Sequence, residues 1–183
     1  EAVRQTPIYG VSPPIDSGRS DLPPFFSNGL AVGRDFFAMF EAPFLHGGPW
    51  SADDDARGGA QVVLSSVLAE RLFGKDDPTG KRLRLFEGEY VVSGVLAPWR
   101  PMPKFYWLVG SNNRFGEADE IFIPIRNALA NESNPNGNVS CNGDGPEPGF
   151  TGLVNSECTF MQYWVELADA GERDAYRERL AGY

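Results

Sequence analysis

Residues 60–96 constrain the fold more than any other part of the sequence. An apolar run at Val62, Val63 and Leu64 predicts a buried strand, and apolar residues then recur at helical spacing. Gly74 predicts the end of that helix. An Asp-Pro-Thr-Gly sequence at residues 77–80 predicts a turn, because proline fixes φ and glycine permits positive φ. Two alternating runs around a reversal at residues 87–89 then predict a hairpin. The order strand, helix, turn, hairpin contains no evident catalytic chemistry.

The composition predicts a globular chain with an acidic surface. Its 183 residues are 42% hydrophobic and 13% aromatic, enough for one domain or for two small lobes that share a core. The formal net charge of -9 argues against a nucleic-acid partner, since no basic stripe is present to bind phosphates. It also argues against a polybasic membrane-binding patch. Acidity by itself identifies no partner.

Membrane and targeting signals are not evident in the sequence. No apolar run approaches the roughly 20 residues needed to cross a bilayer. The first residues do not combine a basic segment with an apolar one, so we expect no signal peptide. The abrupt start and the end within a helix-forming segment lead us to expect an excised domain, with any anchoring segment outside this sequence.

The two cysteines, Cys141 and Cys158, both lie in a loop-like segment, residues 131–157, and its immediate continuation. Asn, Gly, Pro and Ser dominate this segment, and a long loop without structure is uncommon in a compact domain unless it is functional or cross-linked. We therefore predict a disulfide between the two cysteines and an oxidising compartment. The alternative is two unpaired loop thiols. A zinc site is a poor alternative, because further ligands are missing nearby.

The remaining elements follow from periodicity and from proline and glycine positions. Residues 1–24 are expected to be extended, with one edge strand near residues 8–11. The irregular segment, residues 97–116, combines three prolines with many aromatic residues. The other expected elements are strands at 25–32, 120–125 and 160–167, short helices at 35–40 and 126–130, and an amphipathic helix at 169–181.

Several residue sets resemble chemical sites but are better explained otherwise. Residues 74–81 fail as a phosphate-binding loop, because the glycine spacing is wrong and Arg82 stands where Ser or Thr must bind Mg²⁺. Three consecutive acids at residues 53–55 have no EF-hand spacing, so we expect a solvated connector. His46 is the single histidine, and no nucleophile elbow accompanies it. We therefore expect no catalytic residue, no cofactor and no metal.

Aromatic residues of the irregular segment are the candidate contact surface, since Trp and Tyr concentrate at protein interfaces. The residues are Trp99, Phe105, Tyr106 and Trp107. An alternative hypothesis uses them as a sugar platform beside paired carboxylates. The candidate pairs come from Glu117, Asp119 and Glu120, or from Glu87 and Glu89. Carboxylate separation decides that chemistry, and a sequence does not contain it.

Residues 61–96 resemble the periplasmic core domain of MacB-type ABC transporter permeases. The resemblance lies in four consecutive pieces with the sequences VVLS, LAERLFG, DPTGKRLRL and VVSGVL. Upstream, residues 36–47 resemble a further family segment that precedes an acidic connector, and Ile123-Pro124 resembles the end of a family strand. Together the matches cover about residues 30–130. The long cysteine-bearing loop and the proline-rich aromatic segment depart from the family pattern.

The resemblance implies an α+β fold, with a mixed sheet, short helices and two lobes. It implies a β-rich, sabre-like lobe at residues 33–125, inserted into a porter-like lobe made of residues 1–32 and 126–183. It also implies a non-catalytic periplasmic domain of an inner-membrane permease, which relays ATP-driven motion and contacts a substrate or periplasmic protein. Implied partners are the permease's own transmembrane helices, a cytoplasmic ABC ATPase and a second permease copy, with no nucleic acid. The alternative hypothesis is a secreted carbohydrate-binding or carbohydrate-active domain.

Overall fold

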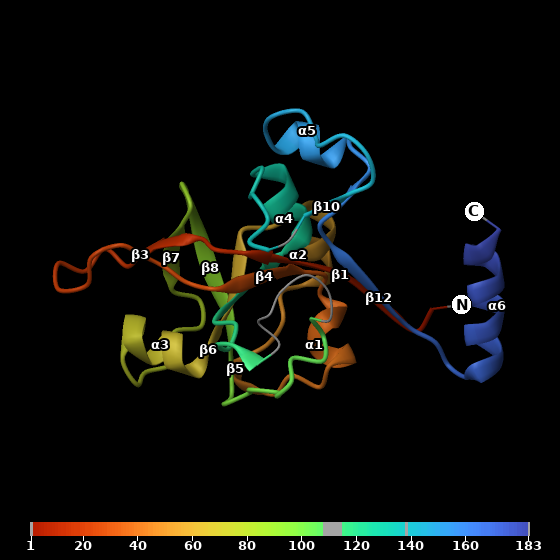
Figure 1. The fold of residues 1–183 in the computed structure, drawn as a ribbon. Helices are drawn as coiled ribbons and strands as arrows, with labels where there is room; N and C mark the ends of the chain where they lie inside the picture. Colours follow the sequence, from red (N-terminus) through yellow and green to blue (C-terminus); the bar gives the residue numbers. More distant parts are fainter. Residues whose placement is uncertain (1, 108–114, 138, 183) are drawn as a thin grey trace.

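The structure is a computed structural model that describes residues 2–107, 115–137 and 139–182. In this part of the chain ten strands form one mixed sheet, in the order β12-β1-β4-β9-β6-β8-β7-β2-β3, with β5 also paired to β8 (Figure 1). The strands of this sheet are β1 (Arg4–Val11), β2 (Pro14–Asp16), β3 (Phe25–Phe26), β4 (Gly29–Val32), β5 (Phe44–Gly47), β6 (Gln61–Ser65), β7 (Arg82–Leu85), β8 (Gly88–Leu96), β9 (Ile121–Pro124) and β12 (Gln162–Glu166). The helices are α1 (Asp35–Met39), α2 (Ala52–Arg57), α3 (Ser66–Phe73), α4 (Ile125–Ala130), α5 (Phe150–Val154) and α6 (Ala170–Ala181). The predicted α+β class, a mixed sheet with short helices, is confirmed.

The unit predicted for residues 60–96 is confirmed as β6, α3, β7 and β8. The Ser65 hydroxyl caps α3 by accepting a hydrogen bond from the Leu68 N–H, 3.1 Å away. Gly74 ends the helix with a φ of 77°, in the positive range that glycine adopts without steric cost. The hairpin reverses at Phe86 and Glu87, one residue earlier than predicted, because Leu85 pairs directly with Gly88.

The prediction of an edge strand near residues 8–11 is wrong in position. The strand β1 lies inside the sheet, with antiparallel β12 on one side and antiparallel β4 on the other. Ile8, Tyr9 and Val11 are fully buried as a result. The prolines of the N-terminal region suggested an edge, but Pro13 and Pro14 fall after the strand ends, and Pro7 lies inside β1 opposite Tyr163 of β12.

Alternate side chains of the central strands enter two separate cores. Ile121 and Ile123 pack in the core that contains residues of α3 and α4, whereas Phe122 packs in the core that contains residues of α1. Val62 and Leu64 follow the first pattern and Val63 the second. The sequence predicted this alternation for residues 120–125. Both faces of these strands are buried, so the sheet is covered on both sides here.

The segment predicted as a long loop, residues 131–157, contains ordered structure. The helix α5 buries Phe150 and Leu153, and β10 (Ser140–Cys141) pairs with β11 (Cys158–Thr159). A disulfide joins Cys141 to Cys158 across this two-stranded ribbon, 17 residues apart in sequence. The predicted disulfide is therefore present.

The predicted C-terminal helix is α6, which begins after Asp169 and has no buried residue. Figure 1 shows α6 apart from the sheet, at the end of β12, with both chain ends close to it. No described helix has the length and apolarity to cross a membrane. The division into a lobe of residues 33–125 and a lobe of both end segments stays a prediction, and strands of both segments lie in the same sheet.

Candidate functional site

The candidate contact residues lie in a strap, residues 97–107, that crosses the aromatic face of α1. The Tyr106 ring packs edge-on against Phe36, 5.5 Å between ring centroids. Trp99 stacks on Tyr106 at 5.2 Å between ring centroids with 15° between the planes, and it also meets Phe36 edge-on at 6.1 Å. Offset stacks and edge-on contacts are the favoured geometries of aromatic pairs. Aromatic packing, and not regular strand pairing, holds this proline-rich segment in place.

A buried ion pair fixes the strap to the segment before β9. The Lys104 Nζ donates to Asp119 Oδ1 at 3.0 Å, and only 6% and 9% of the two side chains are exposed. The Tyr106 hydroxyl donates to the other carboxylate oxygen at 2.8 Å. Burial, together with the Asp119 carboxylate, raises the pKa of the Tyr106 hydroxyl well above its ordinary value. Both oxygens of Asp119 are thus committed to holding the strap.

The four predicted contact residues differ in how much of each side chain is exposed to solvent. Phe105 is 45% exposed, and Trp99 and Trp107 are half-buried. The expected surface position is wrong for Tyr106, which is 2% exposed because Phe36, Trp99 and the Asp119 carboxylate enclose it. The Tyr106 carbonyl also accepts a hydrogen bond from the Trp164 indole at 3.1 Å. Tyr106 is a core anchor of the strap.

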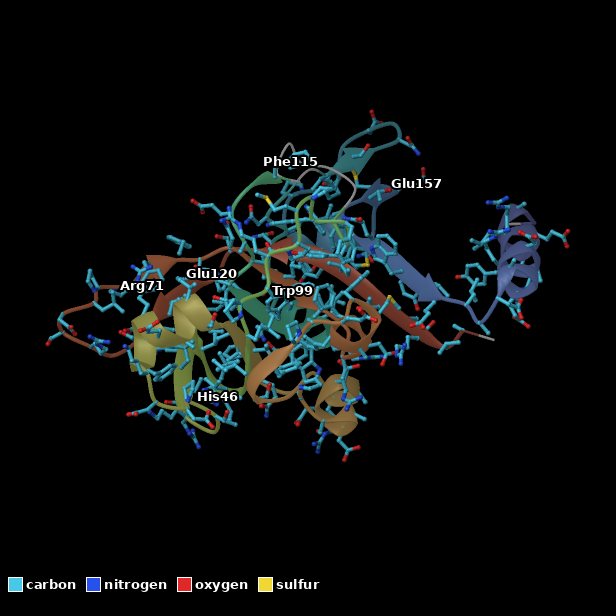
Figure 2. All side chains as sticks on the ribbon, turned by 90° about the horizontal axis from the view of Figure 1, so that it is seen from below. His46, Arg71, Trp99, Phe115, Glu120 and Glu157 are labelled. Atoms are coloured by element: carbon cyan, nitrogen blue, oxygen red, sulfur yellow. A yellow bond between two sulfur atoms is a disulfide. The ribbon has the colours of Figure 1, made fainter. Side chains whose placement is uncertain are left out.

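Trp99 borders a groove of about 730 Å³ between the strap and the start of α3. Two exposed apolar side chains also line it, Phe26 at 73% and Val67 at 69% exposure. Figure 2 shows Trp99, Glu120 and Arg71 across the same face of the molecule. The sequence analysis missed Phe26 and Val67. A signal for Val67 was present, because it lies outside the helical spacing of the buried residues of α3.

The carboxylates considered as a catalytic pair have different environments. Asp119 is held by Lys104 and Tyr106. Glu120 lines the groove, and its Oε2 accepts a hydrogen bond of 2.6 Å from the buried Ser27 hydroxyl. In the β7–β8 hairpin, Glu89 forms an exposed ion pair with Arg82 at 2.7 Å. Asp119 and Glu120 therefore both line the groove with a fixed orientation, and of these two Asp119 has a cationic partner among the described residues.

The other polar candidates have structural roles. Asp55 accepts hydrogen bonds from the Trp50 indole and from the Arg34 N–H. His46 lies 3.7 Å from Asp77, and hydrogen bonds from Thr79 lower the pKa of that carboxyl. Across the described ranges, no group of three or more His, Cys, Asp and Glu side chains could hold a metal ion.

Comparison with known proteins places these features in a family. The family model of the MacB-like periplasmic core domain matches residues 1–183, the whole chain. The chain belongs to this family. A search of curated proteins gave no match.

Solved structures of MacB-like domains share the fold of this chain. The periplasmic region of MacB from Actinobacillus actinomycetemcomitans superposes with a TM-score of 0.63 at 14% identity, over 98% of this chain and 64% of that chain. The extracellular domain of the ABC-type transporter YknZ from Gram-positive bacteria gives a TM-score of 0.57 at 13% identity, over 95% and 70% of the two chains. This chain thus spans about two thirds of the length of those structures. The predicted resemblance to this family is confirmed. The motifs covered about residues 30–130, whereas the family model matches residues 1–183.

Proposed function

We propose that this chain is the extracytoplasmic domain of an ABC transporter permease, and that its role is mechanical and not catalytic. Support comes from the family match over the whole chain. Hydrogen bonds and ion pairs within the fold also hold the polar side chains that were candidates for catalysis, which favours a non-catalytic role. The proposed partners are the permease's own transmembrane helices, a cytoplasmic ABC ATPase and a second permease copy.

The sheet offers a continuous route for motion between the chain ends and the groove. Both ends lie near α6, beside the outer strands β12 and β1 (Figure 1). From there hydrogen-bonded strands follow one another through β4 and β9 to β6, whose last residue lines the groove. Backbone ladders resist shear, so a displacement at the ends moves these strands together. A domain with adjacent ends suits insertion between two transmembrane helices.

The groove beside the strap is the observation that carries the proposed contact role. A monomeric surface seldom keeps several large apolar side chains together unless they serve binding. Phe26 and Val67 are largely exposed there, next to Trp99. The strap is anchored by a desolvated ion pair, so this surface is rigid enough to transmit a push or to hold a partner. The contact would be with a substrate or an extracytoplasmic protein.

Thiol labelling in intact cells tests the location. The two cysteines of the chain form the disulfide, so an added cysteine is the single free thiol of this segment. Val154, 50% exposed on α5, is a suitable position for Val154→Cys in the full-length permease. A membrane-impermeant maleimide should label it before lysis. Labelling that requires lysis would place the domain in the cytoplasm and contradict the proposal.

A further inference from the structure

The groove is long in one direction, because it runs across the ends of neighbouring strands. Its lining includes Asn28 before β4, Glu120 before β9, Ser65 at the end of β6 and Leu96 at the end of β8. These four strands are consecutive in the sheet. Three steps of about 4.8 Å between strands give a length of about 14 Å, the span of about four residues of extended polypeptide.

Three carboxylates line the groove: Glu117 is exposed, Asp119 pairs with Lys104, and Glu120 has no ion-pair partner among the described residues. Glu120 is half-buried, and its hydrogen-bond partner Ser27 is only 5% exposed. Within residues 2–107, 115–137 and 139–182, no lysine, arginine or histidine lies within 4.0 Å of its oxygens. Asp119, its neighbour in sequence, has Lys104 as a buried partner. Since a partly desolvated carboxylate is stabilised by a cation, this site favours a positively charged ligand.

The other groups of the groove match a polypeptide better than a simple amine. Arg71 lines the groove with its guanidinium 3.7 Å above the Phe25 ring, and guanidinium N–H groups bind carbonyl oxygens well. Val67 and Trp99 supply apolar contacts at separate points of the rim. Arg100 is an exposed lining residue that can pair with an acidic side chain of a ligand. A polypeptide offers cationic, carbonyl and apolar groups along one extended chain.

We propose that the groove binds an extended segment of a partner polypeptide, with a lysine or arginine side chain paired to Glu120 and adjacent apolar side chains against Val67 and Trp99. This assignment rests on the proposed contact function, which it makes specific. The bound segment would be extended like a β-strand, but it would cross the ends of the strands and would not pair with an edge strand. Specificity would therefore come from its side chains and not from backbone pairing with the sheet.

Peptide titration of the 183-residue chain tests the assignment. The probe is Ac-GSLKLSG-NH2, and its matched controls carry norleucine or glutamate in place of lysine. Binding is followed by the ¹H–¹⁵N shift of the Trp99 indole, with Trp50 and Trp164 as internal references because their indoles are hydrogen-bonded inside the fold. We expect the lysine peptide to bind with a Kd on the order of 0.1–1 mM, as for a short single-groove ligand.

Two substitutions locate the contact. Glu120→Gln should weaken the lysine peptide by about tenfold or more and remove its advantage over the norleucine peptide, since a charge-assisted hydrogen bond is lost. Glu157→Gln removes a carboxylate far from the groove (Figure 2) and should change nothing. Trp99→Ala, in which the backbone amide shift of the groove residue Val67 replaces the lost indole signal, should weaken all peptides by about three- to tenfold.

Three results would overturn the assignment. The first is equal affinity for the lysine, norleucine and glutamate peptides, or no shift of the Trp99 indole. The second is binding of hexylammonium as tightly as the lysine peptide with the same dependence on Glu120, which identifies a small amine as the occupant. The third is concentration-dependent self-association lost in Glu120→Gln, which identifies a second copy of this chain. None of these results affects the labelling of Val154→Cys, so failure of the peptide assignment and failure of the proposed location are separate.

Discussion

Removal of one partner from the buried Lys104–Asp119 pair should strongly destabilise the domain. Lys104→Met leaves the Asp119 carboxylate, 9% exposed, with the Tyr106 hydroxyl as its remaining side-chain donor among the residues that the structure describes. Loss of one partner of a buried pair costs about 3–5 kcal/mol, because an uncompensated charge stays desolvated. For a chain of this length the corresponding fall in melting temperature is on the order of 10 °C.

The double substitution Lys104→Met with Asp119→Leu separates charge burial from packing. Replacement of both charges by apolar groups of similar volume is often neutral or stabilising. We therefore expect the double variant to regain most of the stability that either single substitution loses. An exposed pair is the matched control: Arg82 and Glu89 are 2.7 Å apart with 70% and 65% of their side chains exposed, so Glu89→Gln should cost under about 1 kcal/mol.

Urea unfolding followed by tryptophan fluorescence measures these differences, and the double-mutant cycle gives the coupling between the two side chains. A loss below about 1 kcal/mol for Lys104→Met, equal to that of Glu89→Gln, would refute the idea that a desolvated ion pair fixes the strap. A double variant as unstable as the sum of the two single variants would refute it as well.

Three further predictions concern other parts of the fold. Reduction of the Cys141–Cys158 disulfide, or replacement of both cysteines by serine, should lower the free energy of unfolding by on the order of 3 kcal/mol, as expected for a sequence separation of 17 residues. An unchanged midpoint of urea unfolding would contradict this prediction. Gly94→Ala should destabilise the domain by about 1–3 kcal/mol, because the added Cβ would lie 2.5 Å from the Gly48 carbonyl oxygen. Gly88→Ala is the control and should be tolerated, because the atom nearest to its added Cβ would be 3.5 Å away. Equal losses of stability for the two variants in thermal unfolding would contradict this prediction. Burial raises the pKa of Tyr9, Tyr90 and Tyr106, so the contribution of these tyrosines to stability should be constant below about pH 10. Above that pH their contribution should fall by up to about 1.4 kcal/mol per pH unit for each tyrosine, and Tyr106→Phe should make the fall shallower in urea titrations from pH 8 to 11.

The parts of the fold that were predictable from sequence are those set by local chemistry. The strand at residues 62–64, the helix end at Gly74 and the alternation in β9 each follow from a few neighbouring residues. The interior position of β1 was not predictable in this way, because its partner β12 lies more than 150 residues later in the chain. The helix α5 had a local signal, Phe150 and Leu153 at a spacing of three, within a composition that otherwise favours a loop.

The candidate site was predictable only in part. Sequence composition identified the aromatic segment, but its packing on α1 depends on contacts between residues some 70 positions apart, as in Phe36 and Tyr106. The position of Lys104 among prolines and aromatic residues was a sequence signal that this lysine is partly buried and needs a partner. Nothing in the neighbouring sequence identifies Asp119 as that partner. The groove combines ends of four strands, so it exists only once the sheet is assembled.

The most direct test of the mechanical role measures thiol reactivity in the full-length permease with and without ATP. Val67→Cys places a thiol at the groove, and Val154→Cys places one on α5 as the reference. We predict that ATP with vanadate changes the rate of maleimide labelling of Val67→Cys while the rate for Val154→Cys stays constant. Identical rates at Val67→Cys in both nucleotide states, in a permease that still hydrolyses ATP, would contradict a domain that relays ATP-driven motion to this groove.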